Sequence, residues 1–226
     1  MATRPIERIS ISDAVAEDLR KRILCGEIAE GIQLRQETLA AEYHVSRMPV
    51  REALKQLEAE GLVTFSPYKG AEVTSLSPDT LTEVLDLRAL IEPDLLRRSI
   101  PNMKKTDILA AERSSRAFDR ALQGNSGDAS ELGRYNWDLH AALYRPAGRE
   151  RTMQFLQTLH YHAERYTRLH VMLAHGRKRA SKDHANLIKH CREGDVEAAC
   201  SLLRQHIEAA EHDLLAFIDE QRESGG

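Results

Sequence analysis

The sequence lacks several features that would place it at once in a common class of proteins. Aromatic residues make up only 5% of its 226 residues, and no apolar run approaches the roughly 20 residues that a membrane-spanning helix needs. It has no excess of positive charge, because the net charge is −3 and residues 1–76 hold ten Lys and Arg against twelve Asp and Glu. Binding to nucleic acid would therefore depend on where individual cations lie and not on an overall basic field.

Cysteine is scarce and follows no pattern. The three cysteines, Cys25, Cys191 and Cys200, have no CxxC spacing. Isolated thiols of this kind are typical of proteins kept reduced in the cytosol. The first ten residues contain no apolar run, so no secretory signal peptide is predicted. We therefore expect a cytoplasmic protein that does not associate with a membrane.

The residues that are abundant favour helices. Hydrophobic residues make up 42% of the chain and charged residues 30%, with aliphatic and helix-forming types prominent. In the first third, apolar spacing and stop residues predict helices over about 12–25, 36–43 and 47–60. The period then changes to that of strands over 62–65 and 71–74, joined by a turn. Three helices followed by a hairpin are typical of a winged helix-turn-helix.

The remaining two thirds of the chain are predicted to be helical. Breaks at proline or glycine separate six segments, and one of these breaks is expected near Gly176. The segments are 79–100, 104–123, 128–145, 149–175, 178–193 and 195–221. We predict a mainly α protein with a winged helix-turn-helix DNA-binding domain over 1–76 and an all-α bundle of about six helices over 77–226. The linker between them is expected at Ser75 to Pro78.

The helix predicted from Arg47 has two contrasting faces. Its apolar residues fall on one face, while Arg47, Arg51 and Lys55 are spaced four apart and share another. A helix in the major groove of DNA needs this division, because one face packs on its domain while long cations reach phosphates and guanine edges. Ser46, at the start of the helix, could donate to a phosphate. For three cations alone, a solvated basic face on a surface helix is the commoner explanation.

The segment Val45-Ser46-Arg47-Met48-Pro49-Val50-Arg51-Glu52-Ala53-Leu54 strongly resembles the signature of GntR-family regulators of the FadR-related branch. The resemblance continues through residues 57–63 and spans most of 10–76. It implies that Arg47 and Arg51 contact bases or phosphates and that Gly70 lets the tip of the wing enter the minor groove. Glu37 stands where some relatives carry a DNA-contacting arginine. The DNA-binding residues that we predict are Ser46, Arg47, Met48, Arg51, Lys55, Lys69 and Gly70.

Three histidines of the helical region are candidates for a metal site. His140 lies one turn after Asn136 on the inward stripe of its helix. His184 and His206 lie ten residues before and twelve after Gly194, so they are nearly level if their helices form an antiparallel pair. Three imidazoles and one oxygen suit Zn, Ni, Cu or another divalent transition metal. The alternative is that each is an ordinary histidine of the core.

The helical region resembles the FCD ligand-binding domain that follows the winged helix in this branch of regulators. The matching pieces are Asn136 to His140, Asp183-His184, Gly194-Asp195 and Gln205-His206, and the resemblance covers about 79–220. It implies a divalent transition metal, Zn or Ni, bound by Asn136, His140, His184 and His206. In many relatives the position of Asn136 is Asp, so this chain keeps the oxygen ligand but not its charge.

Arg88 is a candidate for binding the effector. It follows Leu81 and Leu85 at helical spacing, so it points inward and needs an anion. A carboxylate of a ligand would serve, as the resemblance implies, and so would an ion pair with Glu92 one turn later. The sequence does not favour one over the other.

These features together predict a ligand-responsive regulator of a metabolic operon, a repressor by the habit of the family. Its expected partners are a small organic acid, a second copy of the chain, and operator DNA with a short inverted repeat. The alternative is a metal-dependent helical-bundle enzyme. The sequence has no HExxH, no paired Glu-x-x-His, no GxSxG and no phosphate-binding glycine loop. It also offers the histidines no obvious general base, so we expect no enzyme activity.

Overall fold

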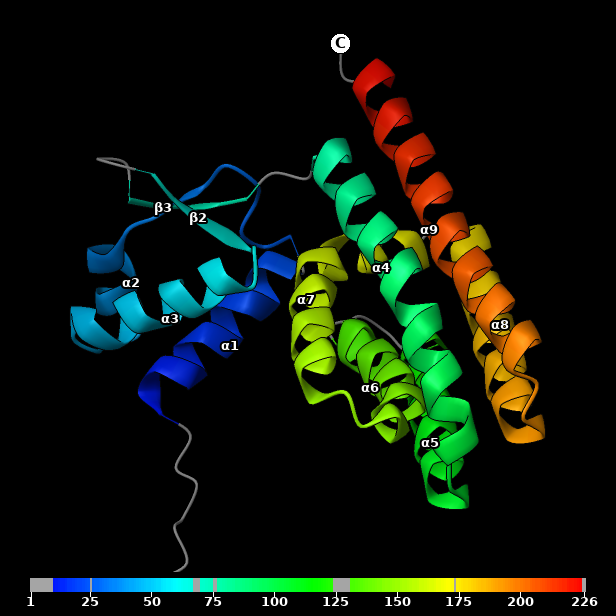
Figure 1. The fold of residues 1–226 in the computed structure, drawn as a ribbon. Helices are drawn as coiled ribbons and strands as arrows, with labels where there is room; N and C mark the ends of the chain where they lie inside the picture. The colour runs from blue at the N-terminus through cyan, green and yellow to red at the C-terminus, as the bar shows by residue number, and fades with distance from the viewer. Residues whose placement is uncertain are drawn as a thin grey trace, which may run out of the picture. The chain divides into compact units, whose positions relative to one another are not determined.

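The computed structural model describes residues 10–24, 26–66, 70–74, 77–123, 131–172 and 174–224, with the side chains of 164–177 and 221–224 left out. The chain forms two compact units, which we call unit 1 (Met1–Ser75) and unit 2 (Leu76–Gly226). Figure 1 labels their elements. Parts of the sequence predictions lie outside the described residues, namely the wing turn at 67–69 with Lys69, Cys25, Ser75 and Leu76 of the linker, and the start of the predicted helix at 128–130.

Unit 1 is a winged helix-turn-helix, as predicted. Its helices are α1 (Ile11–Leu24), α2 (Gln36–Glu42) and α3 (Arg47–Ala59). Its antiparallel sheet has the order β1 (Gln33–Leu34), β3 (Gly70–Val73), β2 (Val63–Ser66). In the wing hairpin Val63 lies opposite Val73, and Ser66 lies opposite Gly70. The strand β1 was not predicted, because two residues are too few to show an alternating pattern.

The core of unit 1 explains the orientation of α3. Val50, Leu54 and Leu57 are fully buried, and α3 packs mainly on α1 through Leu19 and Ile23. Burying these side chains stabilises unit 1 by about 1.5–3 kcal/mol each. Because the apolar residues occupy one face of α3, its opposite face is left to solvent.

The turn between α2 and α3 contains a left-handed residue. His44 has φ 54°, a conformation that costs a non-glycine residue about 1–2 kcal/mol. The hydrogen bond from the amide of Val45 to the carbonyl of Ala40, 3.0 Å long, closes the turn. Ser46 occupies the N-cap position of α3, but its side chain makes no capping hydrogen bond. Its hydroxyl is therefore not engaged at the helix end.

Unit 2 is a bundle of six helices in the described part of the chain, as predicted. They are α4 (Pro78–Ser99), α5 (Lys105–Gln123), α6 (Leu132–Tyr144), α7 (Glu150–Met172), α8 (Ala174–Glu193) and α9 (Val196–Ser224). The predicted break near Gly176 lies a few residues earlier, because α7 ends at Met172 and α8 begins at Ala174. A single glycine inside a helix costs only about 1 kcal/mol relative to alanine, so it does not have to end the helix.

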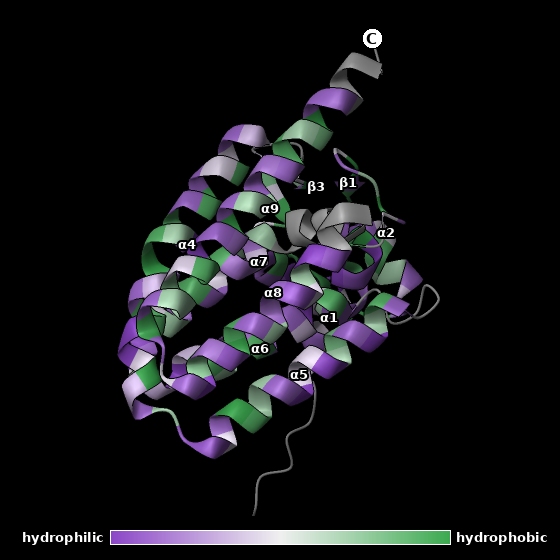
Figure 2. Cartoon of the chain, turned by 90° about the vertical axis from the view of Figure 1, so that its right-hand side faces the viewer, coloured by the Kyte–Doolittle hydropathy of each residue, from purple (hydrophilic) through white to green (hydrophobic). Residues whose placement is uncertain are grey.

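The helices of unit 2 enclose a largely aliphatic core. Helix α4 packs most extensively along α9, α5 packs on α6 and α8, and α8 and α9 form an antiparallel pair around Gly194 (Figure 1). Figure 2 shows hydrophobic and hydrophilic residues interspersed along these helices. Among the described residues, no helix is long and apolar enough to cross a membrane. The buried polar side chains of the bundle include Arg88, Glu92, Ser99, Ser115, Asn136, His140, His160 and His184.

Candidate DNA interface and metal centre

The exposed face of α3 carries the predicted cations. Arg47, Arg51 and Lys55 are all exposed, opposite the buried apolar face. A terminal nitrogen of Arg47 lies 2.9 Å from Oε1 of Glu37 at the start of α2, and Lys55 Nζ lies 3.4 Å from Oε1 of Glu52. No ion pair is recorded for Arg51 within the described residues. An exposed pair of this kind is worth at most about 1 kcal/mol, so DNA phosphates can displace it.

Two further predicted contacts lie on the same unit. Met48 is 63% exposed near the start of α3, although single exposed apolar side chains are common and do not by themselves indicate a partner. Gly70 begins β3 with φ +82°, a conformation that favours glycine, and no atom lies within 4 Å of a Cβ placed there. A side chain at position 70 would therefore meet backbone strain but no clash. Contact of these residues with DNA remains a prediction.

Unit 2 brings together three predicted metal ligands. His140 lies on α6, His184 on α8 and His206 on α9. The ring centroid of His184 lies 5.2 Å from the centroids of His140 and of His206. The centroids of His140 and His206 are 5.8 Å apart. One nitrogen from each ring lies within 4.8 Å of the others, so the three could hold a metal ion. The predicted level placement of His184 and His206 is confirmed.

The hydrogen bonding of these rings fits a bound cation. His140 and His184 are 2% and 1% exposed. His140 Nε2 and both ring nitrogens of His184 are buried and have no hydrogen-bond partner among the described residues. A buried polar atom without a partner costs about 1–3 kcal/mol, and native proteins rarely tolerate several together. A divalent metal that accepts a lone pair from His140 Nε2 and from one nitrogen of His184 would satisfy two of these three atoms, so the residues fit the metal that the family resemblance implies.

Electrostatics keep the rings in the form that binds metals. Burial lowers the pKa of His140 well below its usual range, and the neighbouring rings of His184 and His206 lower it further. Burial, followed by His206, has the same effect on the pKa of His184. Both imidazoles are therefore neutral at pH 7, and only a neutral imidazole donates a lone pair to a metal.

The fourth predicted ligand is less well defined. Asn136 is 4% exposed and lies one turn before His140 on the buried side of α6. Its ligation of a metal remains a prediction. Asp138 does not replace it, because its carboxylate lies 3.6 Å from Arg134 on the outer side of α6. Among the described residues, the carboxylate that contacts the three histidines is instead that of Asp183, whose Oδ2 lies 3.1 Å from Nδ1 of His206.

Arg88 points inward, as predicted, and the structure shows its ion pair. Its Nε donates to Oε1 of Glu92 over 2.6 Å, and the two side chains are 7% and 2% exposed. Burial opposes the charge of Arg88, but the adjacent carboxylate of Glu92 outweighs this effect and raises its pKa. Arg88 therefore stays positively charged inside the bundle. Its contact with an effector remains a prediction.

Two residues beside this cluster were not predicted from the sequence. The hydroxyl of Tyr144 donates to Oε2 of Glu92 over 2.6 Å and lies 3.1 Å from Nδ1 of His140. Its position four residues after His140 could have indicated this. The Nε2 of His160, on α7, lies 3.2 Å from the carbonyl of Gly133, and burial together with Arg88 lowers its pKa to about 3. Only the inward stripe of α7 could have indicated His160.

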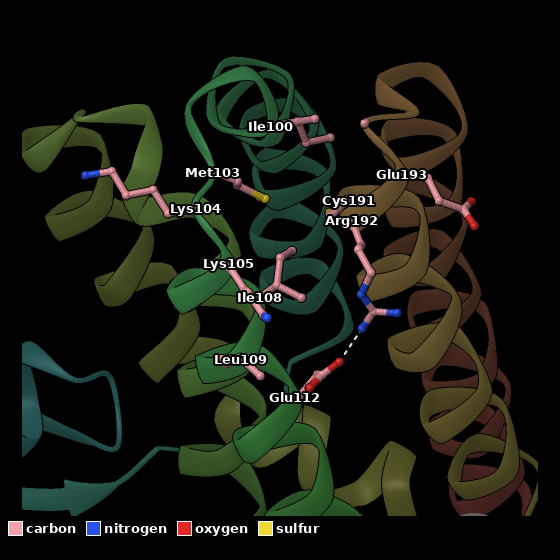
Figure 3. A pocket seen from close by; sticks show the side chains of 11 residues that line it. Ile100, Met103, Lys104, Lys105, Ile108, Leu109, Glu112, Cys191, Arg192 and Glu193 are labelled. Atoms are coloured by element: carbon pink, nitrogen blue, oxygen red, sulfur yellow. Dashed lines mark hydrogen bonds and ion pairs between the residues drawn. The ribbon is translucent and has the colours of Figure 1, made fainter.

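A separate open cavity of about 560 Å³ lies between the start of α5 and the end of α8 (Figure 3). Its apolar wall includes Met103 and Ile108, and Arg192 reaches across it to form an ion pair with Glu112. Lys104 and Lys105 are also among its lining residues. None of the three clustered histidines lines it. The cavity is therefore distinct from the metal centre.

Comparison with known families divides the chain at the same place as its fold. The family described as "Bacterial regulatory proteins, gntR family" matches residues 11–73, and the FCD domain matches residues 83–209. The match to the first lies within unit 1 and the match to the second within unit 2. The two matches together cover most of the chain.

Individual relatives and a solved structure agree with these matches. An uncharacterized HTH-type transcriptional regulator, BphR of Paraburkholderia xenovorans, is 30% identical over 211 residues, covering 91% of this chain and 86% of the relative. The gluconate operon transcriptional repressor of Bacillus subtilis is 39% identical over 95 residues, which are 42% of this chain and 39% of that one. The structure of E. coli McbR/YncC superposes with a TM-score of 0.76 at 17% identity, over 93% of this chain and all of the other. At that identity the superposition supports the fold alone.

Proposed function

The chain belongs to the GntR family of bacterial regulators and carries an FCD domain, and we propose that it is a repressor whose affinity for DNA changes when a small organic acid binds beside a metal ion in unit 2. The family is one of DNA-binding transcription regulators and not of enzymes, so the enzyme alternative is set aside. The observation that carries the proposal is the group of three convergent histidines with unpartnered buried nitrogens, in the same bundle as the inward cation Arg88.

The DNA-binding half of the proposal assigns α3 to the major groove. Arg51, which is exposed and has no ion pair among the described residues, contacts a guanine edge or a phosphate. Arg47 leaves Glu37 to do the same. Ser46 donates to a phosphate at the start of α3, and Met48 and Lys55 complete the contact. Lys69 and Gly70 place the wing against the minor groove. A homodimer presents two such helices to the two halves of a short inverted repeat.

The metal-binding half of the proposal assigns His140, His184 and His206 as ligands, with Asn136 as the fourth. Three imidazoles and an amide oxygen favour Zn or Ni over the harder Mg or Ca. When bound, such an ion would supply a positive charge that attracts the carboxylate of an acid. The absence of a charged oxygen ligand at Asn136 lowers the affinity for the ion relative to a site that contains aspartate.

The chemistry of Arg88 indicates the class of effector. Within the described residues its one recorded partner is Glu92, which takes the Nε–H. A guanidinium has five N–H donors, so the remaining four can bind a carboxylate in the bidentate manner. A small organic acid can therefore pair with Arg88 while it reaches the metal. The acid shifts the helices and the linker near Ser75 to Pro78, and the spacing of the two DNA-binding units in the dimer changes.

The sign of regulation rests on the relatives. One is named as the repressor of a gluconate operon, and gluconate is itself a small organic acid. We therefore propose that the chain represses a metabolic operon and that effector binding lowers its affinity for the operator. DNA binding with and without the acid tests the sign directly, because an activator would keep or gain affinity.

The test of the effector site begins with metal analysis of the purified protein by mass spectrometry. Thermal-shift screening of small organic acids, with and without chelator, follows. Near-stoichiometric metal, together with acids that stabilise only the metal-loaded form, supports the proposal. Acids that stabilise a metal-free protein equally well would mean that Arg88 and the histidines bind the ligand directly. For any substitution of a clustered histidine, His212→Ala is the matched control, because His212 lies on α9 but its side chain is 87% exposed.

A further inference from the structure

His140 is one end of a buried chain of hydrogen bonds that the proposed function does not use. From α4, the Nε of Arg88 donates to Oε1 of Glu92 over 2.6 Å. From α6, the hydroxyl of Tyr144 donates to Oε2 of Glu92 over 2.6 Å and lies 3.1 Å from Nδ1 of His140. All four side chains are at least nine-tenths buried, with Tyr144 fully so. The chain therefore joins a core cation to a candidate metal ligand without contact with solvent.

The position of each proton in this chain follows from the donors and acceptors. A carboxylate can only accept, so the single hydrogen of the Tyr144 hydroxyl goes to Glu92. The tyrosine oxygen is then left with lone pairs alone on the side of His140. A hydrogen bond across the 3.1 Å gap to Nδ1 therefore requires that Nδ1 carries the hydrogen. In a neutral imidazole with this tautomer, Nε2 has the free lone pair.

The nitrogen left with the lone pair is the one that lies in the histidine cluster. His140 Nε2 is buried and has no hydrogen-bond partner among the described residues. His206 is arranged in a similar way, because its Nδ1 lies 3.1 Å from a carboxylate oxygen of Asp183. His184 has no recorded hydrogen-bond partner at either nitrogen in the described part of the chain. Two of the three rings are thus held by an acceptor behind them.

We propose that Glu92 and Tyr144 are positioning residues that hold His140 in the Nδ1–H tautomer and so present Nε2 to the cation. The inference rests on the proposed function in that the cation is the metal ion assigned there. Partners of this kind fix the orientation of a ligand ring and raise its basicity, and their removal typically lowers metal affinity 10- to 100-fold. Their contribution matters more in this chain because three imidazoles and an amide bring no negative charge to the ion.

The test compares two substitutions of the same kind on one helix. Tyr144→Phe removes the hydroxyl that lies between Glu92 and His140 and keeps the ring. Tyr135→Phe removes a hydroxyl from a half-buried tyrosine of α6 that packs in a different cluster. In the metal-free wild type we expect long-range ¹H–¹⁵N NMR to show His140 with its hydrogen on Nδ1. In Tyr144→Phe we expect a mixture of tautomers, and in Tyr135→Phe the wild-type pattern.

The second readout is affinity for Zn²⁺, measured by competition with a chromophoric chelator. We expect Tyr144→Phe to bind Zn²⁺ about 10- to 100-fold more weakly than the wild type and Tyr135→Phe to bind it equally well. If Tyr144→Phe does not fold, the tautomer of His140 in the wild type still tests the inference, because that measurement needs no substitution. A wild-type His140 that carries its hydrogen on Nε2 overturns the inference, as does unchanged Zn²⁺ affinity in a folded Tyr144→Phe. A wild type that binds no Zn²⁺ refutes the metal site instead. The tautomer of His140 then shows whether Glu92 and Tyr144 position its ring.

Discussion

Replacing Arg88 with methionine is expected to destabilise unit 2 severely. The change removes one half of an ion pair whose side chains are 7% and 2% exposed. Methionine has a similar length but no charge, so the carboxylate of Glu92 is left in the core with Tyr144 as its recorded partner. Removing one partner of a buried pair costs about 3–5 kcal/mol, because the remaining charge is uncompensated. That is a large share of the roughly 5–15 kcal/mol that stabilises a typical domain.

The loss can be followed by urea unfolding. Trp137 is the single tryptophan of the chain. It lies on α6, with its ring centroid 5.0 Å from that of His160, so its fluorescence reports on unit 2. With a dependence on urea of about 2 kcal/mol per M, a loss of 3–5 kcal/mol lowers the midpoint by about 1.5–2.5 M. Arg88→Lys keeps the charge but not the guanidinium fork, and its midpoint is expected to fall between those of wild type and Arg88→Met.

The matched control is Arg98→Met. Arg98 forms a pair with Asp94 on the same helix and at the same spacing of four residues, with a distance of 2.8 Å, but both side chains are about half exposed. Water solvates Asp94 after the change, so the midpoint should stay at the wild-type value. A wild-type midpoint for Arg88→Met would refute the reasoning. So would an equal loss in Arg98→Met, because burial would then not be the cause.

Three further results are expected. Arg51→Ala should weaken binding to an operator fragment by about 1–3 kcal/mol, or roughly 5- to 150-fold, in a gel-shift titration. Lys21→Ala, a change at an exposed position on α1, should leave binding unchanged, and equal binding by both variants would remove α3 from the interface. His184→Ala combined with His206→Ala should abolish stoichiometric metal in mass spectrometry, and full metal content in that double variant would show that the site lies elsewhere. The metal-free protein should lose stability as the pH falls below about 6.5. The reason is that the pKa of His160 is lowered to about 3 and those of His140 and His184 are also lowered, so the unfolded chain binds protons that the folded chain does not. Each such histidine lowers the free energy of unfolding by about 1.4 kcal/mol per pH unit between its unfolded and folded pKa, and a urea midpoint equal at pH 7 and pH 5 would contradict their neutral burial.

The helices could be predicted from the sequence because helical spacing of apolar residues is a local property. The buried face of α3 and the inward side of α6 both follow from it. The two differences from the prediction also have local causes. Glycine at position 176 is a weak stop that neighbouring residues override, and β1 exists only because β3 lies beside it, with Leu34 opposite Ala71.

The histidine cluster was partly predictable because hairpin geometry is simple. His184 and His206 stand at similar distances from Gly194 along an antiparallel pair, so their proximity follows from the rise of an α-helix. The approach of His140 does not follow in this way, because α6 is separated from the pair by the whole of α7. A resemblance to a known family supplied that placement, and the fold shows the rings together.

The sequence by itself determined the family to which the chain belongs and the order of its helices. It also determined the face of α3 that carries cations and the inward direction of Arg88 and His140. These properties depend on residues within a few turns of one another. Only the tertiary structure decided that Tyr144 of α6 reaches Glu92 of α4, that Asp183 stands beside His206, and that His160 enters the core. The physical reason is that a hydrogen bond between helices depends on their separation and rotation to within about an ångström, and packing of the whole core sets both.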